Sequence, residues 1–230
     1  MNNKDLITTI SSLDYELDKG GIGELIFGSG VTTLRLVGKA SLDIEALRLQ
    51  ILNEKSSGMT LSPTVGDIYQ DFYQKVSFKN QELLNAFTLK IADIIKTKLY
   101  EANNVQSNVP IVFDSVIIQH YPHSTSDHLY AIPPHYDHKG FVELVIILLL
   151  EGESLFYTAK DKEGKEERVI DANPMDIIVM RGYQFQGKDE RPVHYVKKIT
   201  SLSGRTSLSF RIYSKNEEHL ASIRKAFSVT

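Results

Sequence analysis

The second half of the sequence contains three residues of types that commonly bind metal ions: His135, Asp137 and His194. His135 and Asp137 stand two residues apart in "PPHYDHKGFVELVIILLL", which continues into an apolar run. Side chains two positions apart on an extended segment point to the same side, so an imidazole and a carboxylate would face one spot. His194 opens a later predicted strand, "VHYVKKI". The sequence therefore predicts a metal site built from two imidazoles and one carboxylate.

This set of ligands has a characteristic chemistry. Two imidazoles and one carboxylate on one face of an octahedron leave three adjacent positions open, which is the facial triad of non-haem Fe(II) oxygenases. Nitrogen and oxygen ligands keep the iron redox-active. The open positions can admit O2 and a cosubstrate that binds through two atoms.

A cation for the far end of such a cosubstrate is present in "GRTSLSFRIYS". A 2-oxo acid that chelates a metal needs a positive group beyond its keto end to bind its second carboxylate. Arginine suits this role because its planar fork pairs with both carboxylate oxygens and keeps its charge. Arg205, Ser207 and Arg211 are in phase on a regular strand, so we expect all three to face the same side.

These residues together resemble the Fe(II)/2-oxoglutarate-dependent oxygenase superfamily. "RTSLSFR" is similar to the Arg-x-Asn-x-Thr-Phe-Arg stretch of its AlkB-like branch, and "IQHYPHS" resembles the Asn-x-Tyr segment that precedes the ligands. "NPMDIIVMRG" resembles the Gly-Asp-hydrophobic strand ahead of the second histidine ligand. The similarity runs roughly from Ser115 to Ser214, which is under half the chain.

The resemblance implies a double-stranded β-helix, a distorted jelly roll, with Fe(II) at one mouth. It also implies consumption of O2 and 2-oxoglutarate, release of succinate and CO2, and hydroxylation or desaturation of a C–H bond. The implied metal ligands are His135, Asp137 and His194. The implied 2-oxoglutarate contacts are Arg205 at the distal carboxylate, Tyr121 at the same cosubstrate, Arg211 near the metal, and Ser207 and Gln119.

Three positions depart from the AlkB-like pattern. Gln119 and Ser207 each replace an asparagine of the branch, so the cosubstrate contacts differ in detail. Lys139 stands where AlkB-type enzymes place an acid that meets the amino group of a damaged base, and a cation cannot accept that hydrogen bond. We therefore expect a small polar substrate, with Lys139 and His138 as candidate contacts.

Three other interpretations stay open. One is oxidative demethylation of nucleic acid or protein by an AlkB-type enzyme, and another is a non-catalytic metal-binding β-barrel with the same three ligands. A different metal site, for zinc, could form from a group of histidines near the proposed ligands: His120, His123, His128 and His138.

Periodicity predicts a mainly β domain with packed helices, of the α+β class. A helix is expected in "SLDIEALRLQILNEKSSG" and a longer one from Asn80 to the Asn103–Asn104 pair, whereas "GGIGELIFGSGVTTLRLVGKA" suggests strands separated by glycine turns. Short strands follow from Val112, with a hairpin at "KDKEGKEE" that places Gly164 at positive φ. We expect one oxygenase domain over 1–230: N-terminal helices, supporting strands and a lid (1–111), a catalytic jelly roll (112–214) and a C-terminal helix (215–230).

Composition limits the partners and the compartment. The net charge of −3 provides no overall basic field, so nucleic acid is not favoured, although a local basic groove is compatible with it. The chain has no cysteine, no apolar run longer than "LVIILLL" and no secretory pattern at its start, which is typical of a cytoplasmic protein without membrane spans. The expected partner is a small molecule, and the sequence leaves the oligomeric state open.

Overall fold

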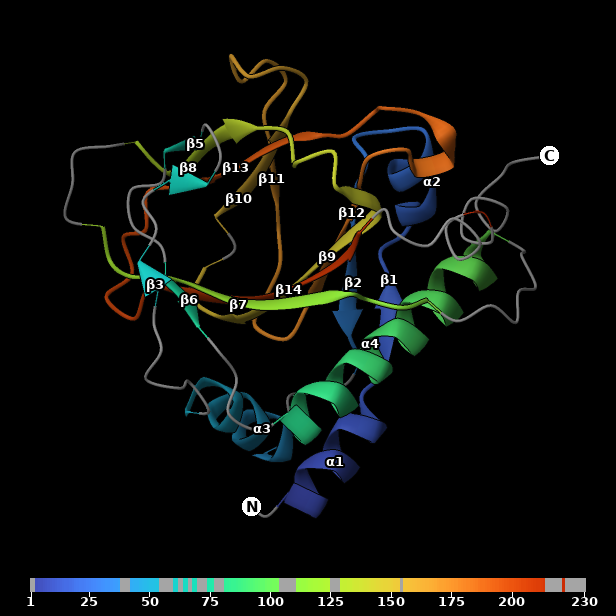
Figure 1. Cartoon of the computed structure of the whole chain (residues 1–230), viewed down its shortest axis with the longest axis vertical. Helices are drawn as coiled ribbons and strands as arrows, with labels where there is room; N and C mark the ends of the chain where they lie inside the picture. Colours follow the sequence, from blue (N-terminus) through green and yellow to red (C-terminus); the bar gives the residue numbers. More distant parts are fainter. Residues whose placement is uncertain are drawn as a thin grey trace.

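The computed structural model describes most of the chain: residues 3–37, 42–53, 60–61, 64–65, 68–69, 74–76, 81–103, 111–124, 129–153, 155–213 and 221. Over these residues, two antiparallel sheets face each other, and helices cover the outer face of the larger sheet (Figure 1). This arrangement is the double-stranded β-helix with packed helices that the sequence predicted. The C-terminal helix predicted for 215–230 lies outside the described residues, apart from Ala221.

The helices are α1 (Asn3–Ser12), α2 (Gly21–Ile26), α3 (Leu42–Asn53) and α4 (Gln81–Ala102), with one 3-10 turn, η1 (Phe185–Gly187). The larger sheet has the order β1 (Tyr15–Leu17), β2 (Val31–Leu36), β12 (Ile177–Arg181), β9 (Phe141–Glu151), β14 (Arg205–Tyr213), β7 (Ser115–Tyr121), β6 (Gln74–Val76) and β3 (Thr60–Leu61). The smaller sheet has the order β11 (Arg168–Ile170), β10 (Phe156–Ala159), β13 (Val193–Lys197) and β8 (Tyr130–His135). A separate ribbon pairs β4 (Thr64–Val65) with β5 (Ile68–Tyr69).

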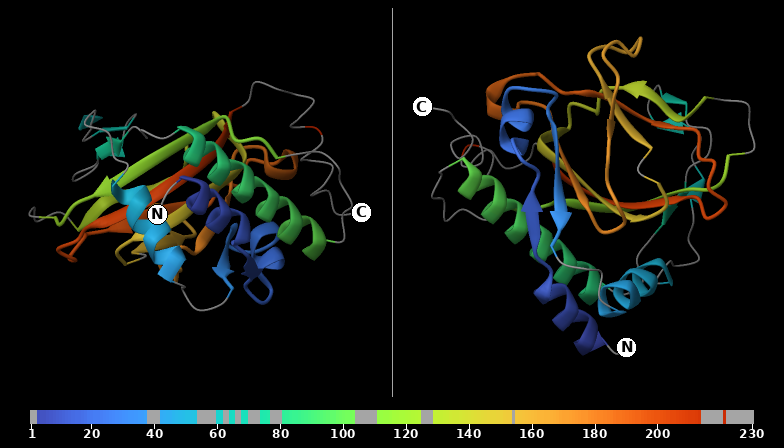
Figure 2. Two further views of the ribbon diagram at one scale, coloured as in Figure 1. Left: turned by 90° about the horizontal axis from the view of Figure 1, so that it is seen from below. Right: turned by 180° about the vertical axis from the view of Figure 1, so that it is seen from behind.

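The apolar run of β9 lies in the middle of the larger sheet, and both of its faces are buried. Leu144, Ile146 and Leu148 belong to the hydrophobic cluster that includes buried residues of α1 and α4. Val145 and Ile147 belong to a second cluster, between the two sheets. The period of two along a strand explains this division, because successive side chains point to opposite faces. The helices on the outer face are seen from below and from behind in Figure 2.

The prediction of strands across "GGIGELIFGSG" is wrong for its first part, because Gly21–Ile26 forms α2. Gly20 caps this helix in the left-handed conformation, at φ 77, and Leu25 and Ile26 are buried. Gly21 lies so close to β2 that an added Cβ would stand 2.3 Å from the Thr32 hydroxyl. The glycines therefore allow close helix–strand packing in addition to turns. Among the described residues of this segment, only Val31–Leu36 forms a strand.

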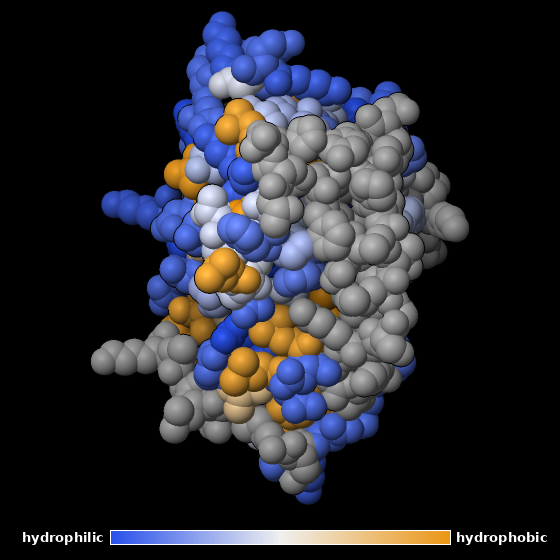
Figure 3. Space-filling model, turned by 90° about the vertical axis from the view of Figure 1, so that its left-hand side faces the viewer, coloured by the Kyte–Doolittle hydropathy of each residue, from blue (hydrophilic) through white to orange (hydrophobic). Residues whose placement is uncertain are grey.

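The other predicted elements that fall on described residues are present. The two N-terminal helices are α3 and α4, and β10 and β11 form the predicted hairpin, in which Gly164 has φ +83. Part of the 1–111 region in which a lid is expected, the segment 56–73, falls largely outside the described residues. On the side that carries β3 and β8, apolar side chains form several separate patches among hydrophilic ones (Figure 3).

The helices in the described part of the chain lack the combination of length and apolar composition that crossing a bilayer requires.

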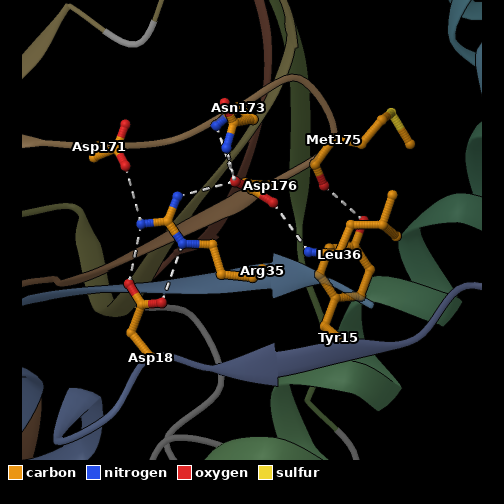
Figure 4. Close-up of polar contacts among 8 residues, drawn as sticks. All are labelled: Tyr15, Asp18, Arg35, Leu36, Asp171, Asn173, Met175 and Asp176. Atoms are coloured by element: carbon orange, nitrogen blue, oxygen red, sulfur yellow. Dashed lines mark hydrogen bonds and ion pairs between the residues drawn. The ribbon is translucent and has the colours of Figure 1, made fainter. Parts of the chain in front are cut away.

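A buried carboxylate, that of Asp176, joins the start of β12 to the antiparallel pair β1–β2 (Figure 4). Asp176 accepts hydrogen bonds from the backbone N–H groups of Leu36, at 3.0 Å, and Asn173, at 2.9 Å. It also accepts one from the Arg35 guanidinium at 3.1 Å, and Arg35 in turn pairs with Asp18. Asp176 is part of the "NPMDIIVMRG" stretch, so this motif fixes the strand that runs towards the barrel mouth.

Replacing Asp176 by asparagine should lower the free energy of unfolding by about 2–4 kcal/mol, because a buried charged acceptor of several donors loses its charge. Urea unfolding followed by circular dichroism measures this change. Asp171→Asn is the matched control, since Asp171 is exposed and meets Arg35 at 3.5 Å. Loss of the Asp171 charge should lower the free energy of unfolding by less than about 1 kcal/mol. Equal losses in the two variants would contradict the central role of Asp176.

Candidate metal centre

The three predicted ligands meet at one end of the smaller sheet. His135 ends β8, His194 lies at the start of β13, and the two residues are direct partners in the antiparallel register of these strands. Asp137 follows two residues after the end of β8. One ligand atom from each residue lies within 4.8 Å of the others, and the distance from His194 Nε2 to Asp137 Oδ1 is 3.8 Å. All three side chains are buried, whereas Tyr136 between them is exposed.

Backbone carbonyls fix the orientation of both imidazoles. His135 Nδ1 donates to the Pro133 carbonyl at 2.8 Å, and His194 Nδ1 donates to the Pro192 carbonyl at 3.2 Å. A carbonyl oxygen can only accept, so each Nδ1 carries a proton, and in the neutral ring the Nε2 lone pair is available to a metal. This is the usual arrangement around metal-binding histidines, in which an outer hydrogen bond sets the ring orientation.

The charge states suit a divalent cation. Burial, aided by the neighbouring His194, lowers the pKa of His135 to about 3, so that protons do not compete for this imidazole at neutral pH. Burial acts to raise the pKa of Asp137, but His194 and Arg211 outweigh it and hold this pKa below its ordinary value. A neutral imidazole and a carboxylate are the forms that bind metal. The residues present therefore fit one metal ion.

Arg191, which the sequence did not mark as functional, links the two segments that carry the ligands. Its Nη1 donates to the backbone carbonyl of Asp137, and its Nε and Nη2 bind the carboxylate of Asp189 at 2.6 and 3.2 Å. The guanidinium also lies over the rings of Tyr136 and Tyr183, at 5.7 and 5.5 Å from their centres. Arg191 thus holds the loop after β8 against the segment before β13.

A cavity of about 50 Å³ extends from these ligands between the sheets, and it contains all the predicted cosubstrate contacts. Arg205 is buried and donates to the Ser207 hydroxyl at 3.3 Å. In the register of β14 and β7, Arg205 faces Tyr121 and Ser207 faces Gln119. The sequence missed Ser209, which lines the same cavity and donates to the Gln119 side-chain oxygen at 2.6 Å. Its position in phase with Ser207 was the available signal.

The two predicted arginines lie in different surroundings within this cavity. Burial lowers the pKa of Arg205, which disfavours its charged form and so favours a nearby anion. Arg211 stacks on Phe141, with its guanidinium carbon 4.3 Å from the ring centre, and its positive charge acts on Asp137. Its buried Nε has no hydrogen-bond partner among the described residues. Arg211 is therefore the arginine that is coupled to the metal ligands.

The other candidate residues do not line the cavity between the sheets. Lys139 is exposed and pairs with Asp189 at 3.6 Å, and His138 accepts from the Gly140 backbone N–H at 3.0 Å. Neither residue lines the cavity between the sheets. In the alternative histidine group, His120 bonds to Thr206 at 2.9 Å, and His128 falls outside the described residues. Within the described part of the chain, only His135, Asp137 and His194 form a group that could hold a metal.

Replacing Arg191 by methionine should weaken metal binding by about tenfold or more, because the clamp between the ligand-bearing segments is lost. Titration of the metal-free protein with Mn(II), followed by calorimetry, measures the affinity. Lys139→Met is the control: Lys139 shares Asp189 and Tyr183 with Arg191 but makes no contact with a ligand residue. The clamp interpretation fails if both variants bind Mn(II) like the wild type.

No protein-family model and no curated protein matches this sequence. Solved structures do share its fold. An oxidoreductase of the 2OG-Fe(II) oxygenase family from Burkholderia pseudomallei has a TM-score of 0.52 at 14% identity, over 89% of this chain and 95% of that chain. The non-heme alpha-ketoglutarate-dependent carbocyclase SnoK from nogalamycin biosynthesis has a TM-score of 0.56 at 15% identity, over 85% and 83%. OsALKBH1 has a TM-score of 0.53 at 15% identity, over 80% and 98%.

Proposed function

We propose that this chain is an Fe(II)- and 2-oxoglutarate-dependent dioxygenase that hydroxylates or desaturates a C–H bond of a small polar substrate, with release of succinate and CO2. One observation carries the proposal. His135, Asp137 and His194 gather at one end of a buried cavity that also contains Arg205. The similarity in fold to 2OG-Fe(II) oxygenase structures supports it.

His135 and His194 would bind Fe(II) through their Nε2 atoms, and Asp137 would bind it through its carboxylate. The bound metal would supply the activation of O2 that is coupled to the oxidative decarboxylation of 2-oxoglutarate. Arg191 keeps the two ligand-bearing segments together. The protein contributes position, because three outer hydrogen bonds hold the ligands: two to the imidazoles and one to the Asp137 backbone.

The cosubstrate would lie along β14. The Arg205 fork suits the distal carboxylate of 2-oxoglutarate, with the Ser207 hydroxyl and Tyr121 beside it. Arg211 would balance charge near the metal, a role supported by the effect of its positive charge on Asp137. Val145, Ile147 and Phe156 form the apolar part of the cavity wall. Lys139 and His138, which follow Asp137 in the sequence, remain candidate contacts for the substrate.

Arg205→Met should lower the affinity for 2-oxoglutarate by roughly 10- to 100-fold while metal binding persists, because one charged hydrogen-bonding partner is lost. His135→Ala should abolish tight Fe(II) binding and, with it, 2-oxoglutarate-dependent succinate release. Calorimetry with Mn(II) and then 2-oxoglutarate separates the two effects, and succinate assays with a substrate panel test the reaction itself.

The controls remove the same side chains elsewhere. Arg48→Met removes a guanidinium on α3, which pairs with Glu45, and His123→Ala removes an exposed imidazole. Both should bind metal and 2-oxoglutarate like the wild type. If His135→Ala binds Fe(II) at wild-type strength, the ligand assignment fails. An unchanged 2-oxoglutarate affinity in Arg205→Met would contradict the assignment of Arg205 to the distal carboxylate.

An AlkB-type demethylase is the second candidate, and the similarity in fold to OsALKBH1 favours it. This function requires binding of single-stranded nucleic acid or of a protein segment. For nucleic acid, the affinity should fall steeply between about 50 and 200 mM salt, because phosphate contacts release counterions. Affinity that does not change over this range would exclude a nucleic-acid substrate.

A non-catalytic metal-binding barrel would use the same three ligands. Anaerobic addition of Fe(II) and 2-oxoglutarate distinguishes it from the enzyme. The enzyme should develop a weak visible charge-transfer band only when both are present. A metal-loaded protein without this band would support the binding protein.

A further inference from the structure

A second and larger cavity, of about 470 Å³, lies next to the metal centre. This volume is typical of small-molecule sites. Its wall includes Thr158 at the end of β10, which pairs in register with His194, and Pro192 and Val193, which immediately precede that ligand. Tyr136, between the other two ligands, also lines it. The lining of this cavity therefore includes direct neighbours of all three candidate ligands, in sequence or in strand pairing.

Among the charged side chains that line this cavity, two arginines are less exposed than the glutamates. The two least exposed are guanidinium groups, with side-chain exposures of 10% for Arg181 and 12% for Arg191. The carboxylates that line the cavity are about half exposed: 49% for Glu24, 57% for Glu166 and 56% for Glu190. Glu24 and Glu166 pair at the rim with Arg168 and Lys160. The rim is therefore balanced in charge, and the deeper wall is positive.

Arg181 is the deep cation with unused hydrogen-bonding capacity. Its Nη1 and Nη2 donate to the carbonyls of Ile26 and Gly28, both at 3.3 Å. The carboxylate of Glu190 lies 3.5 Å from Nη1, at the limit of a hydrogen bond. These contacts use three of the five N–H donors of the guanidinium, and the buried Nε has no acceptor among the described residues. Burial lowers the pKa of Arg181, and Glu190 offsets this only in part.

The backbone makes room for this guanidinium. Gly30 has φ +79, and a Cβ added there would lie 2.4 Å from Arg181 Nε and 2.7 Å from Nη2. The Gly30 carbonyl also accepts the Arg181 backbone N–H at 2.9 Å. A side chain at position 30 would displace the Arg181 guanidinium. The arginine is therefore held by the fold rather than by a strong ion pair.

Arg191 and Lys139 are weaker candidates for binding an anion in this cavity. Arg191 already binds the Asp189 carboxylate through two nitrogens and the Asp137 carbonyl through the third. Lys139 is exposed, pairs with Asp189 and does not line the cavity. Arg181 thus differs from both: it is buried, lines the cavity and has donors to spare.

We infer that the substrate carries an anionic group, a carboxylate or a phosphate, which binds Arg181 in the larger cavity while the carbon to be oxidised lies on the side of His135, Asp137 and His194. This inference rests on the proposed function and adds the substrate class to it. Two oxygens of a carboxylate or phosphate match the planar fork of a guanidinium. The half-exposed Glu190 would turn away as the anion binds.

The test uses the full chain loaded with Mn(II) and N-oxalylglycine, so that the metal and 2-oxoglutarate positions are filled. Benzoate and phenyl phosphate are the anionic probes, and benzamide is the neutral match for benzoate. Calorimetry gives their affinities, and the broadening of probe proton signals by Mn(II) reports whether they bind near the metal. We expect either anion to bind near the metal at least about tenfold more tightly than benzamide. The preferred anion distinguishes a carboxylate substrate from a phosphate substrate.

Two variants with opposite effects separate anion binding from a structural role. Arg181→Gln should weaken anion binding by about tenfold or more, because a charged donor is lost. Glu190→Gln should strengthen it severalfold, because the competing carboxylate is neutralised. A purely structural pair would make both variants less stable and change their anion affinity in the same direction. Arg48→Gln, on α3 and outside the cavity, serves as the control and should change the affinity less than twofold.

The outcomes separate this inference from the proposed function. If Mn(II) and N-oxalylglycine bind but neither anion does, or if the Arg181 and Glu190 variants change the affinity in the same direction, the anionic-substrate inference is overturned. If the anions bind through Arg181 but Mn(II) does not bind, the cavity remains an anion site and its assignment to an oxygenase substrate fails.

Discussion

The antiparallel pairing of β8 with β13 is the constraint on which the candidate site depends. Its register sets His135 opposite His194, although the two residues are far apart in the sequence. A proline stands two residues before each histidine, Pro133 within β8 and Pro192 directly before β13, and each proline carbonyl accepts the Nδ1 proton of that histidine. A slip of the register by one residue would turn one imidazole to the other face of the sheet and break up the group. The metal-binding geometry is thus a consequence of strand pairing before any metal binds.

The larger sheet provides the other half of the site through the alternation along β14. Leu208, Phe210 and Ile212 pack with the cluster under the helices. The side chains that point to the opposite face of β14 face the space between the sheets and line the cavity: Arg205, Ser207, Ser209 and Arg211. Since β14 lies between β9 and β7, it has no free edge, and its polar side chains are held in a rigid row. One strand therefore contributes both to the core and to the polar wall of the cavity.

Two arginines are buried beside the two cavities of this slightly acidic protein. The chain has a net charge of −3, and the charged residues that are buried in its described part are Arg205 and Arg181 together with Glu143, Asp176 and Asp137. Burying a cation is unfavourable unless an anion or a set of acceptors compensates it. Arg205 faces the cavity between the sheets and Arg181 faces the larger cavity at the mouth. This distribution matches an anionic cosubstrate inside the barrel and an anionic substrate at its mouth.

The sequence alone determined the fold class and the residue types of the metal site. The period of two placed His135 with Asp137 and Arg205 with Arg211, and the structure brings each pair to one cavity. The apolar run of β9 predicted a strand buried on both faces, and the helical spacing predicted α3 and α4. Such patterns are local, so they can be read along the chain.

Only the tertiary structure decided which neighbours complete the site. Arg191 contacts the Asp137 carbonyl, and Arg181 contacts carbonyls near α2 that come from the other end of the chain. Neither contact has a periodic signal in the sequence. The prediction of strands in the glycine-rich segment before β2 was wrong for the same reason. The closeness of Gly21 to Thr32 exists only once α2 packs on the sheet. Periodicity specifies which face a side chain occupies, whereas the partner on that face is set by the packing of distant segments.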